Sequence, residues 1–493
     1  MNGLPGSASP EEVCPTSHDL RPQGSGPDAG PPPRPAGGAA KLPLARSLKL
    51  LETAALTVSF VAPTAGVFII APVAFAATGS GTFYTFLLGG AIAVCMAYCY
   101  AELGVAFPYA GGEYSIAGRV IGRPAAFVTF IMWMIQGVFG ISSIALGAAS
   151  YLSGVWPSLN ANAFGAVLVG AGTIIAIFRV NRGAQVTALF LVIELAALAI
   201  IAVLGFSHVH NGAPALFSPH LFPASGGMAP AGAGAIFGGI TFSLFAYNGY
   251  GSAVYFSEEV AAGRRQVGRV VLISLAAVLL VILIPVAAVL VGAPSLGTLS
   301  NSASPMTYFV TTLGNKGLNT ALGIMVVLAV FNAVIASVMA FGRILYCSGR
   351  DHAWPGPVSG WLAAVTPRAR VPWAATLVVG VACLVLTVAS NLAEIVTFTG
   401  VLVAVVYIVV ALAAVASRLR KIPPEREYRM PAWPLAPLLA LAGTVYVLTK
   451  QTGHDLAVTG WILLGSVVYF AAFLWSNRTG RWALHDPPPE DEP

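Results

Sequence analysis

Apolar stretches of membrane-spanning length recur along this chain of 493 residues and limit its fold more than any other feature. A helix of about 20 apolar residues crosses the hydrocarbon core of a bilayer. The composition agrees, because 57% of the residues are hydrophobic and 9% are charged, whereas soluble domains carry about 25% charged residues. We therefore expect an all-α integral membrane protein with about twelve transmembrane helices. The expected spans cover residues 50–77, 82–106, 125–152, 161–178, 184–206, 232–257, 270–292, 319–347, 373–390, 393–416, 433–449 and 458–476.

The two ends of the chain lack this pattern. Residues 1–45 are rich in Pro, Gly and Ser and contain no apolar core of a cleavable signal peptide, so we expect a disordered N-terminal tail. Residues 479–493 predict a C-terminal tail of the same kind. Residues 46–478 are expected to form one transmembrane domain.

Basic residues are concentrated in every second connection between the expected spans. Cytoplasmic loops carry an excess of Lys and Arg, so we expect both termini on the cytoplasmic side of the cell membrane. The net charge of +6 then reflects loops near anionic headgroups, and the lipid bilayer, not nucleic acid, is the expected partner. These basic residues are Arg119, Arg123, Arg179, Arg182, Arg264, Arg265, Arg269, Arg343, Arg350, Arg418, Arg420 and Lys421.

Two expected spans are interrupted near their middle. The first contains SFVAPTAGVFIIAP, in which Pro63 removes a backbone donor and Gly66 relaxes the backbone dihedrals. The sixth contains FAYNGYGSAVYF, with Asn248, Gly249 and Gly251 near its middle. Paired interruptions in matching segments indicate a transporter's binding site. A single kink would carry less weight, because Gly and Pro are frequent in membrane helices.

The spacing of the two interruptions predicts an internal repeat. Five spans form each repeat, residues 50–206 and 232–416, and the odd number inverts the second copy in the membrane. Two further helices follow at 433–476. Each half-helix that starts after a break would then direct its N–H groups towards the bilayer centre, where they would receive an anionic or polar group. The carbonyl groups on the opposite sides would receive a cation or an ammonium group.

The residues at the two breaks are the candidates for binding a substrate. Backbone groups are the expected contacts, so glycine and small residues are included with the aromatic ones. The tyrosines and the asparagine at the second break would equally well pack beside it. The candidates are Pro63, Thr64, Ala65, Gly66, Tyr247, Asn248, Gly249 and Tyr250.

One carboxylate is expected squarely at mid-membrane depth. Glu194 lies near the middle of the fifth span, and an ionisable residue at that depth is a functional candidate by default. A carboxyl group in a low-dielectric bundle favours its neutral form, which suits a group that carries protons. We take Glu194, with Ser337, as the candidate coupling residues and the proton as the candidate coupling ion. The alternative is a permanently neutral acid bonded to Ser337 or to a carbonyl group.

Three other acids receive structural interpretations. Glu102 and Glu113 lie near Arg119 and Arg123, where structural ion pairs are expected. Glu394 lies at the start of the tenth span, where an acid stabilises the helix N-terminus.

Other classes of protein find little support. The five cysteines show no disulfide or metal-ligand spacing, and no histidine falls in the middle of a span, so we expect neither an enzyme nor a bound cofactor. No ATP-binding motif is present, which argues against direct ATP coupling. A channel or receptor-like sensor is a third class, but single interruptions in two inverted halves favour one central site over a continuous pore.

Four segments resemble signatures of the amino acid–polyamine–organocation permeases. AELGVAFPYAGGEYSIAGRVIGRP at 101–124 resembles the segment between that family's second and third helices. FAYNGYGSAVYFSEEV resembles its sixth helix, FNAVIASVMAFGRILYCSGRDHAWP its eighth, and REYRMPAWPLAP the link before its eleventh. The resemblance implies a five-plus-five inverted-repeat fold with two extra helices, and transport of amino acids or related small amines by alternating access. Polyamine or amino-alcohol permeases and exchangers of the same fold are the alternative.

The chain departs from the family pattern at two places. Amino acid carriers of this family usually have Gly-Ser-Gly in the first break, where this chain has Thr64, Ala65 and Gly66. Many members place a lysine in the fifth helix, where this chain has Glu194. The first departure predicts weaker recognition of a substrate carboxylate. The second predicts that the coupling of transport to an ion differs from that of family members with the lysine.

Overall fold

The computed structural model describes residues 49–109, 111–178, 183–255, 257, 264–366, 371–423 and 427–475. All described residues belong to one compact unit of the chain. Both expected tails, 1–45 and 479–493, lie outside the described residues, as do Arg179 and Arg182.

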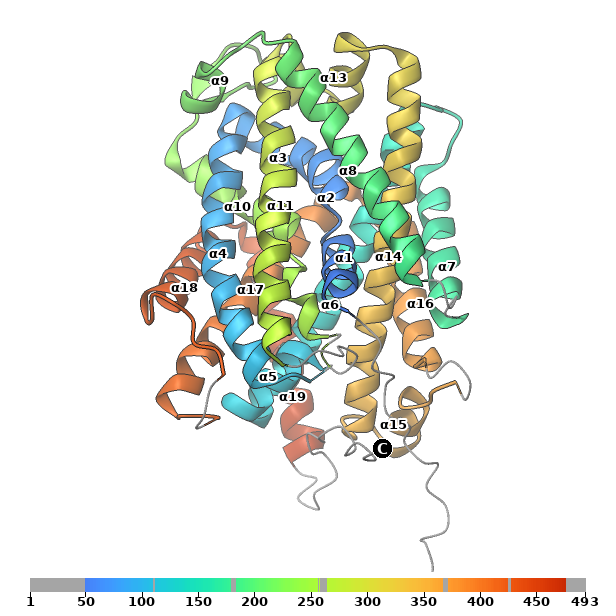
Figure 1. Cartoon of the computed structure of the whole chain (residues 1–493), viewed down its shortest axis with the longest axis vertical. Coiled ribbons are helices and arrows are strands. Elements are labelled where there is room, and N and C mark those ends of the chain that lie inside the picture. The colour runs from blue at the N-terminus through green and yellow to red at the C-terminus, as the bar shows by residue number, and fades with distance from the viewer. Residues whose placement is uncertain are drawn as a thin grey trace, which may run out of the picture. The chain divides into compact units, whose positions relative to one another are not determined.

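The described chain is almost entirely helical (Figure 1). The elements of its first half are α1 (Leu50–Val61), α2 (Pro63–Ala65), the π-helix η1 (Gly66–Ile70), α3 (Ala71–Thr78), η2 (Gly79–Gly81), α4 (Thr82–Ala106), α5 (Gly112–Val120), α6 (Arg123–Ser153), α7 (Ala161–Phe178), α8 (Gly183–Ser207), α9 (Pro214–Phe217), β1 (His220–Leu221) and β2 (Ala229–Pro230). The elements of its second half are α10 (Ala233–Tyr247), the 3₁₀-helix η3 (Tyr250–Val254), α11 (Arg264–Gly292), α12 (Leu296–Asn301), α13 (Pro305–Leu313), α14 (Lys316–Arg350), α15 (Gly356–Leu362), α16 (Trp373–Ala389), α17 (Leu392–Leu419), α18 (Leu435–Leu448), α19 (Gly453–Tyr469) and the π-helix η5 (Phe470–Trp475).

Many of these helices are long and apolar enough to cross a membrane. Eight such stretches occur among the described residues, and the first, Leu50–Ala106, includes two of the expected spans. Trp373–Ala389 and Leu435–Leu448 are shorter apolar helices. The expectation of an all-helical, multi-pass membrane protein is thereby confirmed, while the count of twelve spans stays a prediction.

The first break occurs one residue before Pro63. α1 ends at Val61, and Ala62 takes the left-handed conformation with φ 55° and ψ 66°. A proline disfavours the right-handed helical region at the residue before it, which explains why the helix ends there. Gly66 was expected to relax the backbone, but it has helical dihedrals (φ −54°, ψ −44°). Its small size serves packing instead, because a Cβ atom there would lie 2.9 Å from Ile282 Cδ1.

The second break lies between α10 and η3. Asn248 is extended, with φ −62° and ψ 145°, and Gly249 has φ 117°, a value that favours glycine. A Cβ atom on Gly249 would lie 2.7 Å from Phe60 Cδ1 and 3.1 Å from Val61 Cα. The two breaks therefore touch, and the glycine is required by both its dihedral angle and its closeness to α1.

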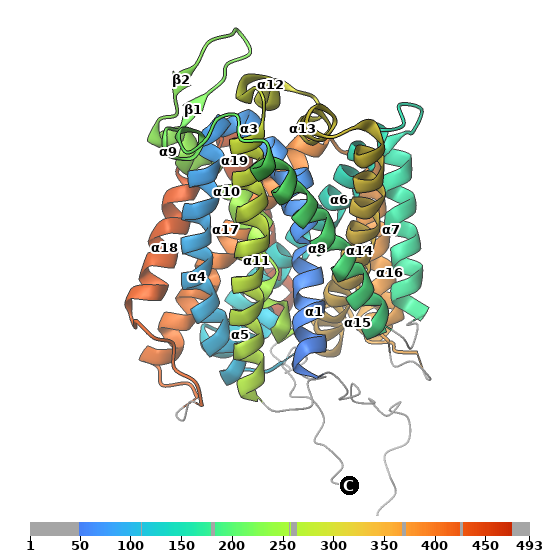
Figure 2. The same cartoon turned by 45° about the horizontal axis from the view of Figure 1, so that its top comes forward.

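The helices around the breaks form one bundle. α1 packs against α8, α11 and α14, and α10 packs against α4 and α17, an arrangement that can be followed in Figures 1 and 2. One end of the bundle carries α9, α12, α13 and the β1–β2 hairpin, in which His220 pairs with Pro230 (Figure 2). We call this the hairpin end. The opposite end, with α5, α15 and the arginine-bearing ends of α14 and α17, is called the basic end.

Candidate substrate site

A small cavity of about 30 Å³ lies where the two breaks meet. It has room for water-sized molecules but not for an amino acid, so a substrate of that size requires the surrounding helices to move apart. α1, η1, α6, α10 and α14 all contribute to its wall. The lining residues are Phe60, Val61, Ile70, Gln136, Gly137, Gly140, Ile141, Ile144, Phe245, Asn248, Ser337 and Phe341.

The lining is mostly aliphatic and aromatic and contains no charged side chain among the described residues. Its polar side chains are Gln136, Asn248 and Ser337. Asn248 Oδ1 accepts a hydrogen bond from the Tyr407 hydroxyl at 3.4 Å. Helices α1 and α10 both end at the cavity, and the last carbonyl groups of a helix carry partial negative charge without intrahelical partners. The partial negative charge of two helix ends therefore lies at the cavity.

Only some of the residues predicted from sequence line this cavity. Asn248 and Ser337 do so. The ring of Tyr247 lies edge-on to Phe86, and that of Tyr250 lies edge-on to Tyr100. Both tyrosines are fully buried in this packing. The other predicted binding residues at the breaks, which are also outside the lining, are Pro63, Thr64, Ala65, Gly66 and Gly249.

Glu194 contacts the first break directly. Its side chain, on α8, is buried, and Oε1 accepts a hydrogen bond of 2.8 Å from the backbone N–H of Thr64. This N–H belongs to the first turn of the half-helix that starts at Pro63. The neutral-acid alternative named Ser337 or a carbonyl group as the partner of Glu194, and the structure provides an N–H donor instead. A donor that was expected to be free for substrate is thus paired with a carboxyl group of the protein.

Aromatic residues close the cavity towards the basic end. The ring centroid of Phe60 lies 5.9 Å from that of Phe341 and 6.0 Å from that of Tyr255. Trp133 packs against both Phe341 and Tyr255. These four residues are named the aromatic plug. They belong to α1, α6, α14 and the segment after η3, so the plug joins these four parts of the bundle.

Glu113 holds the aromatic plug from the basic end. Its Oε1 accepts a hydrogen bond of 2.8 Å from the Tyr255 hydroxyl. Burial raises the pKa of the Glu113 carboxyl to about 7. Sequence reasoning placed this acid in an ion pair with Arg119 or Arg123, but the structure gives it a tyrosine partner, and the Arg119 guanidinium lies 3.9 Å from the centre of the Tyr109 ring. The expected ion pair was wrong because α5 places the Glu113 side chain inside the bundle, next to Tyr255.

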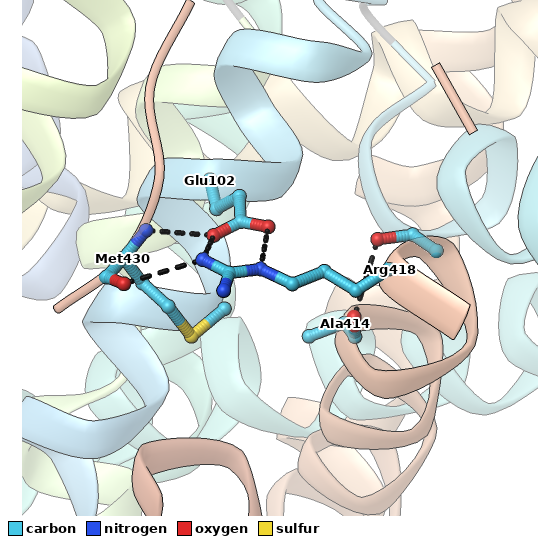
Figure 3. A network of polar contacts seen from close by, with 5 residues as sticks. Glu102, Ala414, Arg418 and Met430 are labelled. Carbon is cyan, nitrogen blue, oxygen red and sulfur yellow. Dashed lines mark hydrogen bonds and ion pairs between the residues drawn. The ribbon is translucent and has the colours of Figure 1, made fainter. Parts of the chain in front are cut away.

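Glu102 does form a structural ion pair, but with a residue far away in the sequence (Figure 3). Arg418, near the end of α17, binds both carboxylate oxygens, with Nε donating to Oε1 at 2.8 Å. The Met430 N–H donates to Glu102 Oε2 at 2.7 Å, and Arg418 also donates to the Met430 carbonyl at 3.2 Å. The guanidinium lies 4.6 Å from the centre of the Trp433 ring. The pair therefore ties α4, α17 and the segment before α18 together.

A larger cavity of about 340 Å³ lies towards the hairpin end. The consecutive residues Ile69 and Ile70 of η1 line the large and the small cavity respectively. A Cβ atom on Gly147 of α6 would lie 2.2 Å from Ile69 Cγ2, so η1 and α6 are in close contact there. The contact between η1 and α6 thus lies between the two cavities.

Gln136 is the main cavity residue that sequence reasoning missed. The sequence did contain a signal for this residue, since MWMIQGVFG places one amide side chain in the middle of an apolar span, next to a glycine. Phe60 and Phe341 carried no such signal, because aromatic residues are common throughout the spans. The face that each helix presents to the cavity was not predictable from their composition.

A helical membrane bundle in which two broken helices meet at a buried cavity, with a larger cavity on one side, is the architecture of a solute transporter. Comparison with known proteins agrees. The amino acid permease family model matches residues 48–473, and the chain belongs to this family.

Individual relatives are distant but similar over most of their length. The chain is 24% identical to the branched-chain amino acid permease BcaP of Lactococcus lactis, over 81% of this chain and 88% of the relative. It is also 24% identical to the methylthioribose transporter of Bacillus subtilis, over 87% of this chain and 93% of the relative. The identity to the Asc-type amino acid transporter 1 of Mus musculus is 22%, over 80% of this chain and 75% of the relative.

Proposed function

We propose that the protein is a secondary active transporter that moves amino acids or related small amines across the cell membrane by alternating access. The observation that carries the proposal is the small cavity at the junction of the two breaks. It lies between the contact of η1 with α6 at Ile69 on one side and the aromatic plug on the other. Two closures around one site are what alternating access requires, because each must open in turn while the other stays shut.

The lining of the cavity supports a substrate with an apolar, uncharged body. Ile70, Ile141, Ile144 and Phe245 offer surface for an aliphatic or aromatic group, and the described lining has no charge to match a charged side chain. One relative is named for branched-chain amino acids, which fit this lining. A polyamine or amino-alcohol permease, or an exchanger of the same fold, is the runner-up, and methylthioribose belongs in any substrate screen because another relative is named for it.

Glu194 and Ser337 are the proposed coupling residues, with the proton as the coupling ion. The carboxyl group of Glu194 is buried and bonded to the N–H of Thr64 at the first break. If the half-helix starting at Pro63 moves during the transport cycle, this bond changes, and with it the ease of protonating Glu194. That link between helix movement and protonation is what proton coupling needs.

The basic end is proposed to face the cytoplasm, with both termini on that side. Arginines at the ends of α14 and α17 and in α5 support this orientation. The bundle is proposed to consist of two inverted repeats of five spans, each starting with one of the broken helices, followed by two further spans. In this orientation the described conformation is closed towards the cytoplasm and has its larger cavity on the outer side.

Counterflow in proteoliposomes tests the proposed function. Vesicles containing the purified protein are loaded with an unlabelled candidate substrate and diluted into a trace of the labelled compound. A carrier accumulates the label transiently without any ion gradient or ATP, and a panel of neutral, cationic and acidic amino acids, polyamines, amino alcohols and methylthioribose identifies the substrate. A channel would only equilibrate the label, and an enzyme would convert it. The absence of counterflow for every compound in the panel would overturn the proposal.

A further inference from the structure

One polar side chain of the central cavity has no partner within the described part of the chain. Gln136 is 3% exposed, and its Oε1 atom is buried without a hydrogen bond. Buried polar side-chain atoms in native proteins are nearly always paired, and an unpaired one is destabilising unless a ligand or a water molecule completes it. Since Gln136 lines the cavity, a molecule in the cavity is the available partner.

The surroundings of Gln136 place its buried amide group beside the cavity, where it becomes available when the helices move apart for a substrate. Gly137 and Gly140 line the cavity from the same helix. A Cβ atom on Gly137 would lie 2.3 Å from Phe341 Cε1, so the aromatic ring rests directly on the backbone of α6. A Cβ atom on Gly140 would lie 3.4 Å from Gln136 Nε2 and 3.7 Å from Phe245 Cε2, so a larger residue there would crowd the amide. Gly137 thus lets Phe341 pack against the backbone of α6, and Gly140 leaves space beside the amide of Gln136.

The balance of donors and acceptors indicates the kind of group that Gln136 binds. The C-terminal ends of α1 and α10, which carry partial negative charge, lie at the cavity, and the described lining contains no lysine, arginine or histidine. The backbone N–H of Thr64, which a carboxylate could have used, is already bonded to Glu194. A group that donates several hydrogen bonds and carries positive charge matches this environment, and a lone carboxylate does not.

We propose that Gln136 is a substrate-binding residue whose carbonyl oxygen accepts a hydrogen bond from the ammonium group of the transported molecule. The apolar part of the lining then holds an uncharged aliphatic or aromatic body. The substrate class is a primary amine with an apolar body, for which a carboxylate is dispensable. This inference rests on the proposed transport function and specifies the chemistry of its central site.

Three compounds that share one branched aliphatic body test the inference. Leucine carries both charged groups, 3-methylbutylamine only the ammonium group, and 4-methylpentanoate only the carboxylate. Binding to the purified full-length protein in lipid nanodiscs is measured by isothermal titration calorimetry. We expect leucine and 3-methylbutylamine to bind and 4-methylpentanoate to bind at least about tenfold more weakly than either, because its charge finds no partner.

Two variants locate the effect at Gln136. Gln136→Met keeps the length of the side chain but removes the acceptor, and we expect it to weaken binding of both amines by roughly 10- to 100-fold. Asn332→Leu is the matched control, because Asn332 is an equally buried amide with an unpaired nitrogen that is not part of the described lining. We expect it to leave both affinities unchanged.

Several results would overturn the inference. They are equal affinities for wild type and Gln136→Met, tighter binding of 4-methylpentanoate than of 3-methylbutylamine, or binding of methylthioribose with no binding of either amine. Suppose that the wild-type protein shows counterflow of an amine and that Gln136→Met binds this amine as tightly as the wild type. The inference about Gln136 then fails, and the transport function stands. If the wild-type protein binds none of the three compounds and shows no counterflow, both fail.

Discussion

The carboxyl group of Glu194 accepts a hydrogen bond of 2.8 Å from the backbone N–H of Thr64, a residue 130 positions away. The half-helix that begins at Pro63 is therefore capped by an acid from another helix, much as an N-cap side chain would cap it. An acid at this place can serve the helix in its ionised form and can lose that role when it is protonated. The bond joins the backbone of the first break to the only acid that we propose as a coupling group.

Replacing Glu194 with glutamine should abolish the response of transport to a proton gradient. Glutamine retains an oxygen that can accept from Thr64, so the fold should survive, but it cannot bind and release a proton. An inward gradient of about one pH unit supplies about 1.4 kcal/mol per proton, enough for about tenfold accumulation. We expect this accumulation with the wild-type protein and none with Glu194→Gln, measured in proteoliposomes at zero membrane potential.

The same acid predicts a loss of stability when no acceptor remains. Glu194→Leu leaves the buried N–H of Thr64 without its partner, at a cost of about 1–3 kcal/mol. Thermal unfolding in nanodiscs should therefore rank wild type and Glu194→Gln above Glu194→Leu. Equal stability of all three proteins would mean that the bond between Glu194 and Thr64 contributes nothing.

A side chain at Gly249 should stop transport. Gly249 has φ 117°, and a Cβ atom there would lie 2.7 Å from Phe60 Cδ1. Gly249→Ala adds backbone strain of about 1–2 kcal/mol and forces the two breaks apart; Gly249→Leu and Gly66→Leu, the latter against Ile282, should act more strongly. Uptake of the counterflow substrate is the measurement, with membrane expression and size-exclusion elution as checks on folding.

Gly234→Ala is the control for this experiment. Gly234 lies in α10, and a Cβ atom there meets no other atom within 4 Å. Because alanine favours helices more than glycine does, this change should leave uptake intact. Near-normal uptake by Gly249→Leu and Gly66→Leu would show that the breaks are not part of the transport site.

The ion pair between Glu102 and Arg418 should matter far more for stability than an exposed pair. Glu102 is 1% exposed and Arg418 is 16% exposed, and both take part in further hydrogen bonds with Met430. Arg418→Met leaves a buried carboxylate without its cation, which costs about 3–5 kcal/mol. The loss should appear as a lower unfolding temperature of the purified protein.

A second ion pair at the same end of the bundle provides the control. Arg265 and Glu427 are 3.8 Å apart but 70% and 53% exposed. Solvent screens such a pair, so Arg265→Met should change the free energy of unfolding by about 0–1 kcal/mol. Comparable losses in the two variants would contradict the structural role of Glu102.

Glu113 should make the stability of the protein fall as the pH rises from about 4.5 to 7. Burial raises the pKa of this carboxyl from 4.5 to about 7, so between these values the folded protein keeps a proton that the unfolded chain has released. The folded state binds more protons in this window, and its stability decreases with pH there and levels off above it. The total effect of this group is at most about 3 kcal/mol, since one pKa unit corresponds to about 1.4 kcal/mol.

Unfolding temperatures at pH 5, 6, 7 and 8 test this dependence. Glu113→Gln mimics the neutral acid and keeps an oxygen for the Tyr255 hydroxyl, so its profile should be flatter than that of the wild type. Glu394→Gln, at an exposed acid in the first turn of α17, is the matched Glu-to-Gln comparison outside the aromatic plug. If Glu113→Gln and wild type have parallel profiles, Glu113 does not titrate in this range.

Sequence reasoning succeeded where the physical constraint is local. Membrane-length apolar stretches must be helical because a bilayer offers no partners for backbone groups, and the described helices follow the expected spans closely. The breaks were also predictable, because proline and glycine act on the backbone dihedral angles in their immediate neighbourhood. Pro63 keeps Ala62 out of the right-handed helical region, and Gly249 has a dihedral angle that favours glycine. The mistaken role of Gly66 shows the limit of such reasoning, because a glycine can also be required by a neighbouring helix.

The partners of the polar side chains were decided by the tertiary structure. A helix that is apolar on every side can be rotated about its axis without changing its fit to the membrane, so its sequence does not reveal which residue faces the cavity. Nothing near Gln136 in the sequence places its amide against the ends of α1 and α10. The same holds for Glu102 and Arg418, which are 316 positions apart. The sequence by itself determined where helices form and where they break, and the packing of those helices determined which side chains meet, because contacts between helices depend on rotation and tilt that no local pattern encodes.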